Sequence, residues 1–325
     1  MNLRLSTIRI GILAVCGLWG AAAAGCALEP YQYGRGWHEP PTATPAPSDT
    51  DSAPQICEGR PNKLVDGVGW VLGIPGKVLL WDRRVNNHAV SADTTTEVSD
   101  YLEQNQLPDV CVRVNQYAPG EEWRRLRENR NVGAGWRYTL GTLSLVGYTL
   151  IPGRLVGRDR YNPYTNSLYV YSDIPSLAIQ SAAYAKDVHL RSRPGTYAAV
   201  NELPVMSLWH DTVNTNDALG YVRASASCDE QAEAQRILYP YYGTRVGGSV
   251  GSIWGPDLLL VAGGAVIGHV TGRLQTQRVP TPDETVAPSA QTDRRTSTAI
   301  AEAPVLESTM PIARGQQTDG PIMPE

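Results

Sequence analysis

The sequence predicts an α+β fold with a small mixed sheet, because helical and strand patterns alternate along residues 59–274. Apolar residues recur at helical spacing in 91–107, which begins with Ser and Asp as N-cap candidates. Residues 109–118 alternate between Val and polar side chains, as in a strand. A second helix is expected over 120–130, and a second alternating strand, half-buried, over 166–173.

Three further stretches complete this part of the chain. The apolar stretch 68–82 has Gly and Pro breaks, which suits either a buried strand or a short surface-docking segment. The 14 uncharged residues from 138 to 151 fall short of the roughly 20 that a spanning helix needs, so a buried hairpin or core helix is expected there. Asp173 and Pro175 then form a helix start, and the helix is expected to extend to residue 190.

The second half of the core is expected to be helical. A short helix is predicted over 214–224, and 227–239 opens with a capping box of Ser227 and Glu230. Turn residues are expected to end that helix at 239–248. The Gly-rich tract 246–272 carries one charge and predicts a core helix, with a membrane-embedded hairpin as the alternative.

The first 26 residues have the layout of an export signal: two Arg residues precede an uncharged run ending in "AAGC". That ending resembles the bacterial lipoprotein box, which implies removal of residues 1–25 and lipidation of Cys26. The family prefers Leu where Ala23 stands. Ala27 rather than Asp follows the cysteine, which for that family implies the outer membrane or the periplasmic face of the envelope. The alternative is an ordinary signal peptide cut within the Ala run, and both interpretations predict export.

Composition separates the core from its flanks. Residues 26–58 are rich in Pro, Ser and Thr and predict a tether, while 275–325 has the same character and predicts a disordered tail. The net charge of −4 and the pI near 5.8 argue against a nucleic-acid partner. Cys57, Cys111 and Cys228 match no metal motif, and in an oxidising compartment they allow one disulfide whose pairing stays open.

The stretch "LAIQSAAYAKD" with its neighbours resembles the active-site region of zincin peptidases, in particular gluzincins of the M48-like type. In zincins an H-E-x-x-H helix holds zinc because residues four apart share one face. The layout of strand, helix and downstream helix over about 155–243 matches theirs. The resemblance places Gln180 and Tyr184 at the two His positions, Ser181 at the Glu, and Asp211 in "LWHDTVNTNDAL" at the downstream Glu.

The replacements do not suit zinc chemistry. A Gln amide is a weak neutral ligand, a Tyr phenol with a pKa of about 10 is protonated at neutral pH, and Ser is no general base. The resemblance therefore implies a zincin-like fold with an edge strand over a central pseudo-active helix, no catalytic residues and no zinc cofactor. The alternative is an unrelated α+β domain.

A binding cleft is expected between the strand that carries Tyr169 and Tyr171 and the 175–190 helix, with Tyr161, Tyr164 and Tyr184 in its aromatic rim. The function expected is that of a lipid-anchored scaffolding or binding protein of the cell envelope, attached to the membrane and contacting a peptide or an envelope protein. Two alternatives remain open. One is a metallohydrolase with a nonstandard site of Asp187, His210 and Asp211, and the other is a membrane-integrated structural protein that uses 246–272.

Overall fold

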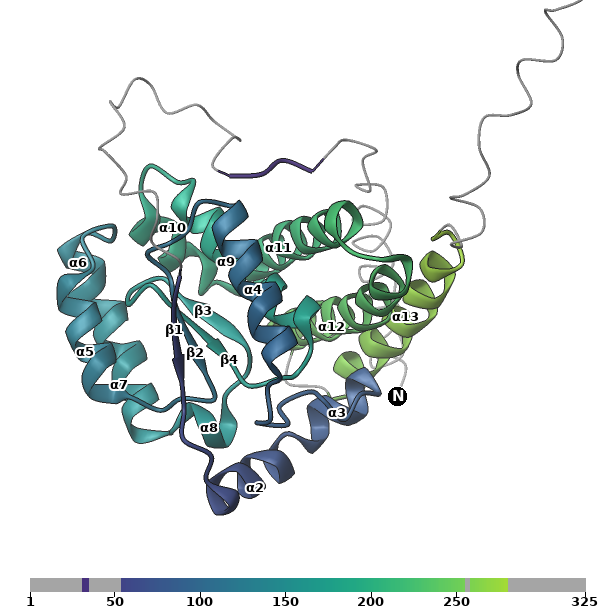
Figure 1. Ribbon diagram of the computed structural model, residues 1–325, viewed down its shortest axis with the longest axis horizontal. Coiled ribbons are helices and arrows are strands. Elements are labelled where there is room, and N and C mark those ends of the chain that lie inside the picture. Colours follow the sequence, from purple (N-terminus) through teal and green to yellow (C-terminus); the bar gives the residue numbers. More distant parts are fainter. Residues whose placement is uncertain (1–30, 35–53, 255–257, 280–325) are drawn as a thin grey trace, which may run out of the picture. The chain divides into compact units, whose positions relative to one another are not determined.

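A computed structural model describes residues 31–34, 54–254 and 258–279. The fold is α+β, as predicted, and its core is a four-stranded mixed sheet of order β1-β2-β4-β3 (Figure 1). Strands β1 (Gln55–Glu58), β2 (Cys111–Val114) and β4 (Ser167–Val170) run parallel. The short edge strand β3 (Arg160–Asn162) pairs antiparallel with β4. The sheet thus begins within the segment expected to be a tether.

Helices cover both faces of the sheet (Figure 1). Val112, Val114, Leu168 and Val170 pack with α4 and α9 in the larger core, while Tyr169 and Tyr171 pack with α5 and α7 in a second core. The prediction of a half-buried 166–173 strand is therefore wrong, since two helical layers bury both sides. The bounds of the helices are α2 Lys63–Leu72, α3 Ile74–Leu80, α4 Ala92–Gln104, α5 Pro119–Glu128, α6 Ala134–Trp136, a π-helix Arg137–Gly141, α7 Thr142–Leu150, α8 Gly153–Val156, α9 Pro175–His189, α10 Pro194–Asn201, α11 Pro204–Ser225, α12 Cys228–Trp254 and α13 Leu258–Thr276.

The 175–190 helix exists as α9 and is almost wholly buried at the centre of the domain. Its start differs from the prediction. Asp173 accepts hydrogen bonds from the backbone and hydroxyl of Ser91 (2.8 and 2.6 Å), so it supports the start of α4, where Ser91 is the N-cap. Pro175 alone begins α9, because its missing N–H needs no partner in a first turn.

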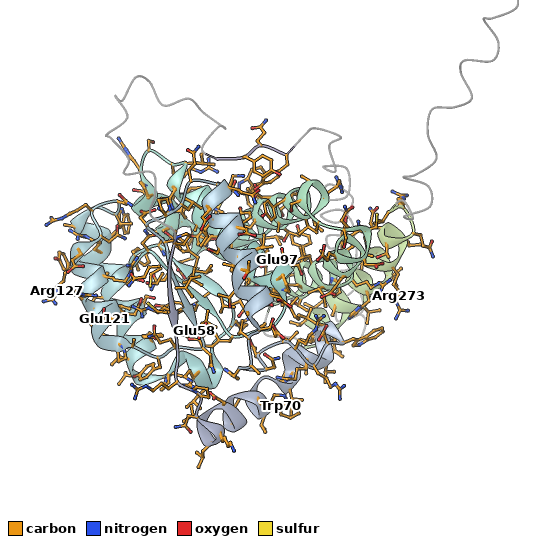
Figure 2. All side chains as sticks on the ribbon, viewed as in Figure 1. Glu58, Trp70, Glu97, Glu121, Arg127 and Arg273 are labelled. Carbon is orange, nitrogen blue, oxygen red and sulfur yellow. The ribbon has the colours of Figure 1, made fainter. Side chains whose placement is uncertain are left out.

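Residues 68–82 form no strand but lie in α2 and α3, which run along the surface with their apolar side chains outward. Leu64, Val68 and Val78 are exposed, whereas Lys77 is buried and donates to the carbonyl oxygens of Trp70 and Asn86 (both 3.1 Å). Figure 2 shows Trp70 on the outer side of this segment. The amphipathic pattern is the reverse of that in an ordinary surface helix. Residues 138–151 are likewise helical and half exposed rather than a buried hairpin or core helix.

The C-terminal helices are longer than predicted. The 214–224 segment is part of α11, and α12 continues through Pro240 to Trp254 instead of ending in a turn. Helices α12 and α13 pack backbone to backbone, because a Cβ on Gly264 would lie 2.1 Å from the carbonyl oxygen of Gly243. One face of α13 remains exposed, so it is a peripheral helix and not the core helix expected.

Residues 31–34 dock onto the domain. The Tyr31 hydroxyl donates to Asn105 and to Asp217 (both 3.1 Å), and it accepts from the Lys186 ammonium at 2.9 Å. Lys186 in turn forms an ion pair with Asp217 at 2.8 Å. This part of the predicted tether is therefore held in place by a buried polar network on α4, α9 and α11.

Candidate functional site

The four positions that the zincin resemblance selects lie together. Gln180, Ser181 and Tyr184 on α9 and Asp211 on α11 line one cavity of about 930 Å³. Its size is at the upper end of ligand pockets, which span about 300–1,000 Å³. Helical spacing places the three α9 residues on one face, and α11 crosses that face with Asp211. Gln180, Ser181 and Asp211 are all less than a tenth exposed.

Both β3 and the 166–173 strand, as β4, contact this helix, and β3 is the one at the edge of the sheet. Because β3 is the edge of the sheet, the cavity extends around it and reaches both of its sides. Tyr161 on β3 packs in the core with α9, while Tyr169 and Tyr171 point to the opposite face. All three line the cavity, which has seven tyrosines in its wall: Tyr148, Tyr161, Tyr164, Tyr169, Tyr171, Tyr184 and Tyr241.

Asp211 is paired with a cation from the chain itself. The Arg245 guanidinium on α12 donates through Nε to Asp211 Oδ2 at 2.7 Å. Burial raises the pKa of Asp211, and the positive charges of Arg245 and Arg158 oppose that rise. Arg245 therefore balances the one carboxylate that the zincin layout would give to a metal.

The residues present do not fit a zinc site. Burial raises the pKa of Tyr184 far above the usual range of a phenol, so the group stays protonated. Gln180 is neutral, and Asp211 is held by Arg245. Across residues 31–34, 54–254 and 258–279, no three His, Cys, Asp or Glu side chains cluster as metal ligands. No step through a metal is therefore derived.

The nonstandard site of Asp187, His210 and Asp211 does not form as predicted. Asp187 hydrogen-bonds with Arg191 and with the Tyr197 hydroxyl, and it is not part of the cavity wall. His210 lines the cavity and stacks on Tyr197 with ring centroids 4.2 Å apart. Burial lowers the pKa of His210, so the ring is neutral at physiological pH. Only His210 and Asp211 of this trio reach the cavity.

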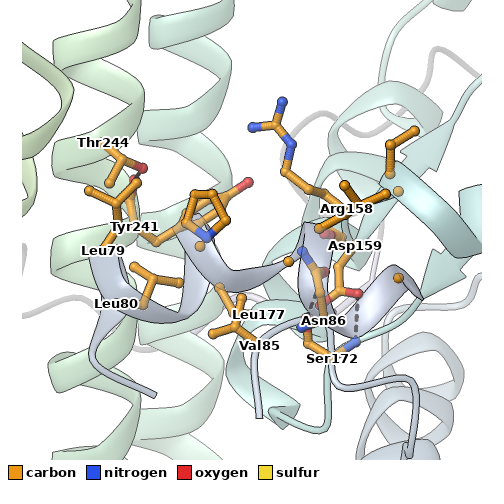
Figure 3. A pocket seen from close by; sticks show the side chains of 18 of the residues that line it. Leu79, Leu80, Val85, Asn86, Arg158, Asp159, Ser172, Leu177, Tyr241 and Thr244 are labelled. Atoms are coloured by element: carbon orange, nitrogen blue, oxygen red, sulfur yellow. Dashed lines mark hydrogen bonds between the residues drawn. The ribbon is translucent and has the colours of Figure 1, made fainter. Parts of the chain in front are cut away.

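Five charged residues that the sequence analysis did not select stand in the wall. Two are Glu202 and Arg245, and the other three are Arg158 and Asp159 from the segment that connects α8 to β3, and Arg160 at the start of β3. Asp159 is buried, and its Oδ1 accepts from the backbone N–H groups of Tyr171 (2.6 Å) and Ser172 (3.0 Å). Figure 3 shows Asp159 beside Ser172. Burial raises the pKa of Asp159 to about 6 in spite of these bonds. The alternating charges of "GRDRY" are visible in the sequence, but such a pattern ordinarily indicates a solvent-exposed loop and not the wall of a cavity.

Several buried polar atoms of the wall have no hydrogen-bond partner within the described parts of the chain. They are Asp159 Oδ2, Tyr164 Oη, Tyr171 Oη, Asn201 Oδ1, His210 Nδ1 and Asn214 Oδ1. Leaving such a group unsatisfied costs about 1–3 kcal/mol, and native proteins rarely do so without water or a ligand. Each of these atoms is itself buried, so it reaches a polar occupant of the cavity only after its side chain turns.

A second, smaller cavity of about 270 Å³ adjoins the first. The two share Arg158, Asp159, Ser181 and Tyr241 as common wall (Figure 3). Its remaining wall is mostly apolar and comes largely from α2 and α3, with Leu79 and Leu80 among the lining side chains. Asp159 therefore lies between a polar chamber and an apolar one.

Comparison of the chain with family models, with curated proteins and with solved structures gives no match. Cys26 lies outside the described residues. Within the described ones, α13 alone is long and apolar enough to cross a membrane, a criterion that core helices of water-soluble proteins also meet.

Proposed function

We propose that this protein is an exported, lipid-anchored protein of the cell envelope whose zincin-like domain binds a peptide without cleaving it. The observation that carries the proposal is the convergence of Gln180, Ser181, Tyr184 and Asp211 on one large cavity beside an edge strand. Zinc-peptidase geometry without zinc chemistry leaves a binding site. The export and anchoring parts rest on the N-terminal sequence that ends in Cys26.

The wall suits a peptide. The edge strand β3 presents backbone groups to which an extended chain adds as a further strand. Tyrosines supply broad contact area together with a polar tip, as in many peptide-binding surfaces.

Gly147 on α7 provides the test. It lines the cavity, and a Cβ built on it meets no atom within 4 Å. Gly147→Trp fills the chamber, and Gly147→Ala is the matched control because it adds only a methyl group. Retention of peptide pools by the purified full chain, measured by mass spectrometry, is expected for the native chain and the Ala variant and lost in the Trp variant. Equal peptide retention by Gly147→Trp and Gly147→Ala would show that the peptide does not bind in the cavity.

The zincin placement has its own test. Gln180→His, Ser181→Glu and Tyr184→His, combined with Arg245→Gln to free the Asp211 carboxylate, restore a gluzincin ligand set. Elemental mass spectrometry after dialysis against trace zinc is expected to find about one zinc per chain in this variant. The same variant with Tyr184 left unchanged is the control. Zinc uptake no greater than in the control contradicts the placement.

A second candidate is a membrane-contacting structural protein. It is favoured by the outward apolar side chains of α2 and α3, and by the exposed face of α13, which includes Val266 and Val270. Trp70 and Trp81 are the aromatic residues typical of a membrane interface. Amide hydrogen exchange in the presence of lipid vesicles separates the two candidates. Slower exchange over 63–80 and 258–276, together with no retention of peptides by the chain, favours the structural role.

A further inference from the structure

The ligand group that the cavity recognises can be argued from its charges, and this step rests on the proposed function. Two guanidinium groups, Arg158 and Arg245, stand at the end of the cavity where α12 forms the wall. Both act electrostatically on Asp211 and on Tyr241, which places the four side chains in one cluster. We call this cluster the cationic pole.

Both guanidinium groups of the pole have N–H groups that donate no hydrogen bond within the described residues. The hydrogen bond from Arg245 to Asp211 uses Nε. Arg158 is exposed, and among the described residues it has neither a hydrogen bond nor an ion pair; Figure 3 shows its guanidinium extending away from Asp159. Arg160 in the same wall lies over the Tyr169 ring, 5.7 Å from its centroid. Guanidinium forks without partners are suited to a planar anion.

The carboxylates of the wall leave guanidinium N–H groups of the pole without a partner. Asp211 balances Arg245, and Asp159 uses Oδ1 for two backbone N–H groups. Glu202 stands elsewhere in the cavity, where its charge acts on Tyr164 and Tyr184. Asp159 and Asp211 balance the charges of Arg158 and Arg245, so what the pole offers a ligand is the unoccupied N–H groups of the two guanidiniums.

We propose that the cavity binds its peptide through a free carboxylate group, held by the Arg158 guanidinium together with the free Nη groups of Arg245. The carboxylate occupies the end of the chamber at which Asp211 stands. It comes either from the peptide C-terminus or from an acidic side chain, and both present the same planar anion to the two forks. The edge strand β3 and the tyrosine wall then contact the rest of the peptide.

The test uses the purified full chain and three pools of random hexapeptides. The first pool lacks Asp and Glu and has free C-terminal carboxylates, the second is the same pool amidated at the C-terminus, and the third is amidated but contains Asp and Glu. Retention is measured by affinity selection and mass spectrometry for the native chain, for Arg158→Gln and for Arg127→Gln. Arg127, labelled in Figure 2, is an exposed arginine on α5 that does not line the cavity, and it serves as the matched control.

The native chain and Arg127→Gln are expected to retain the first or the third pool at least about tenfold better than the second, the size of one charge-assisted hydrogen bond. Arg158→Gln is expected to remove most of that preference, and Arg158→Glu to abolish it. Which pool is preferred identifies the source of the carboxylate. Thermal melting checks that each variant is folded.

Three outcomes overturn the inference, and they differ in what else they overturn. Equal retention of all three pools by the native chain, lost in Gly147→Trp, rejects the carboxylate while the peptide-binding function stands. Retention of no pool rejects both. A preference for carboxylates that survives unchanged in Arg158→Glu also rejects the cationic pole.

Discussion

Asp159 allows a quantitative test of the electrostatics of the cavity. Its carboxyl group is buried, one oxygen accepts two backbone N–H groups, and the other oxygen has no partner in the described chain. Burial raises its pKa from 3.8 to about 6. Asp159→Asn keeps the accepting oxygen and removes the charge, so it isolates the cost of the buried carboxylate.

The sign follows from proton linkage. The carboxyl group of Asp159 binds its proton more tightly in the folded state than in the unfolded state, so the ionised group destabilises the fold. This destabilisation grows as the pH rises above the unfolded pKa and is complete once the pH has passed the folded pKa. The gap between 3.8 and about 6, at about 1.4 kcal/mol per pH unit, corresponds to about 3 kcal/mol. Asp159→Asn is therefore expected to raise the free energy of unfolding by about 3 kcal/mol at pH 7.5 and by only about 0.5 kcal/mol at pH 4.

Urea denaturation of the native and variant chains at both pH values, followed by circular dichroism, measures the difference. Subtracting the two curves removes the opposite contributions of Asp66 and Asp173, whose pKa values are lowered and which are common to both chains. A variant that is no more stable than the native chain at pH 7.5 would refute the reasoning. A difference that is the same at both pH values would refute it as well.

Three further predictions concern the fold. Gly264→Ala is expected to lower the free energy of unfolding by about 1–3 kcal/mol, because the added methyl group meets the backbone of α12. Gly263→Ala adds its methyl group in open space and should raise the free energy of unfolding by about 0.5–1 kcal/mol. Urea denaturation compares the two variants, and equal effects would contradict the close packing of α12 and α13. Glu122→Ala should cost about 3–5 kcal/mol in the same assay because it leaves a buried guanidinium unpaired, and a loss below 1 kcal/mol would contradict this. Mild oxidation should join Cys57 and Cys111, whose sulfur atoms are 3.9 Å apart, detectable as a disulfide-linked peptide; two thiols that remain reduced would contradict it.

Local patterns in the sequence predicted much of the fold. The capping box of Ser227 and Glu230 forms with the Ser227 N–H bonded to the Glu230 carboxylate at 2.7 Å, and α4 begins at Ser91. Such signals act within one turn of helix, so a single sequence contains them. The continuation of α12 through Pro240 was missed, because packing against α13 outweighs the local preference of proline.

The candidate site was predictable only in part, for a related reason. Spacing along α9 identified Gln180, Ser181 and Tyr184, and order along the chain identified Asp211. Arg245 was not identified, because it comes from α12 and meets Asp211 only through tertiary packing. Asp159 resembled a solvated loop residue until the fold buried it. The sequence also did not reveal that the apolar face of α2 points outward, because the period of an amphipathic helix does not say which side faces the protein.

The pairing of Arg245 with Asp211 has a consequence for the conditions under which the cavity works. A zinc peptidase depends on the metal that its surroundings supply, and chelators or zinc starvation empty its site. Here the balancing cation is encoded in the chain and keeps its charge at every physiological pH, because the pKa of Arg245 is raised further above its already high value. The cavity therefore keeps its electrostatic character in zinc-poor media and in the presence of chelators, conditions under which zinc-dependent peptidases lose their function.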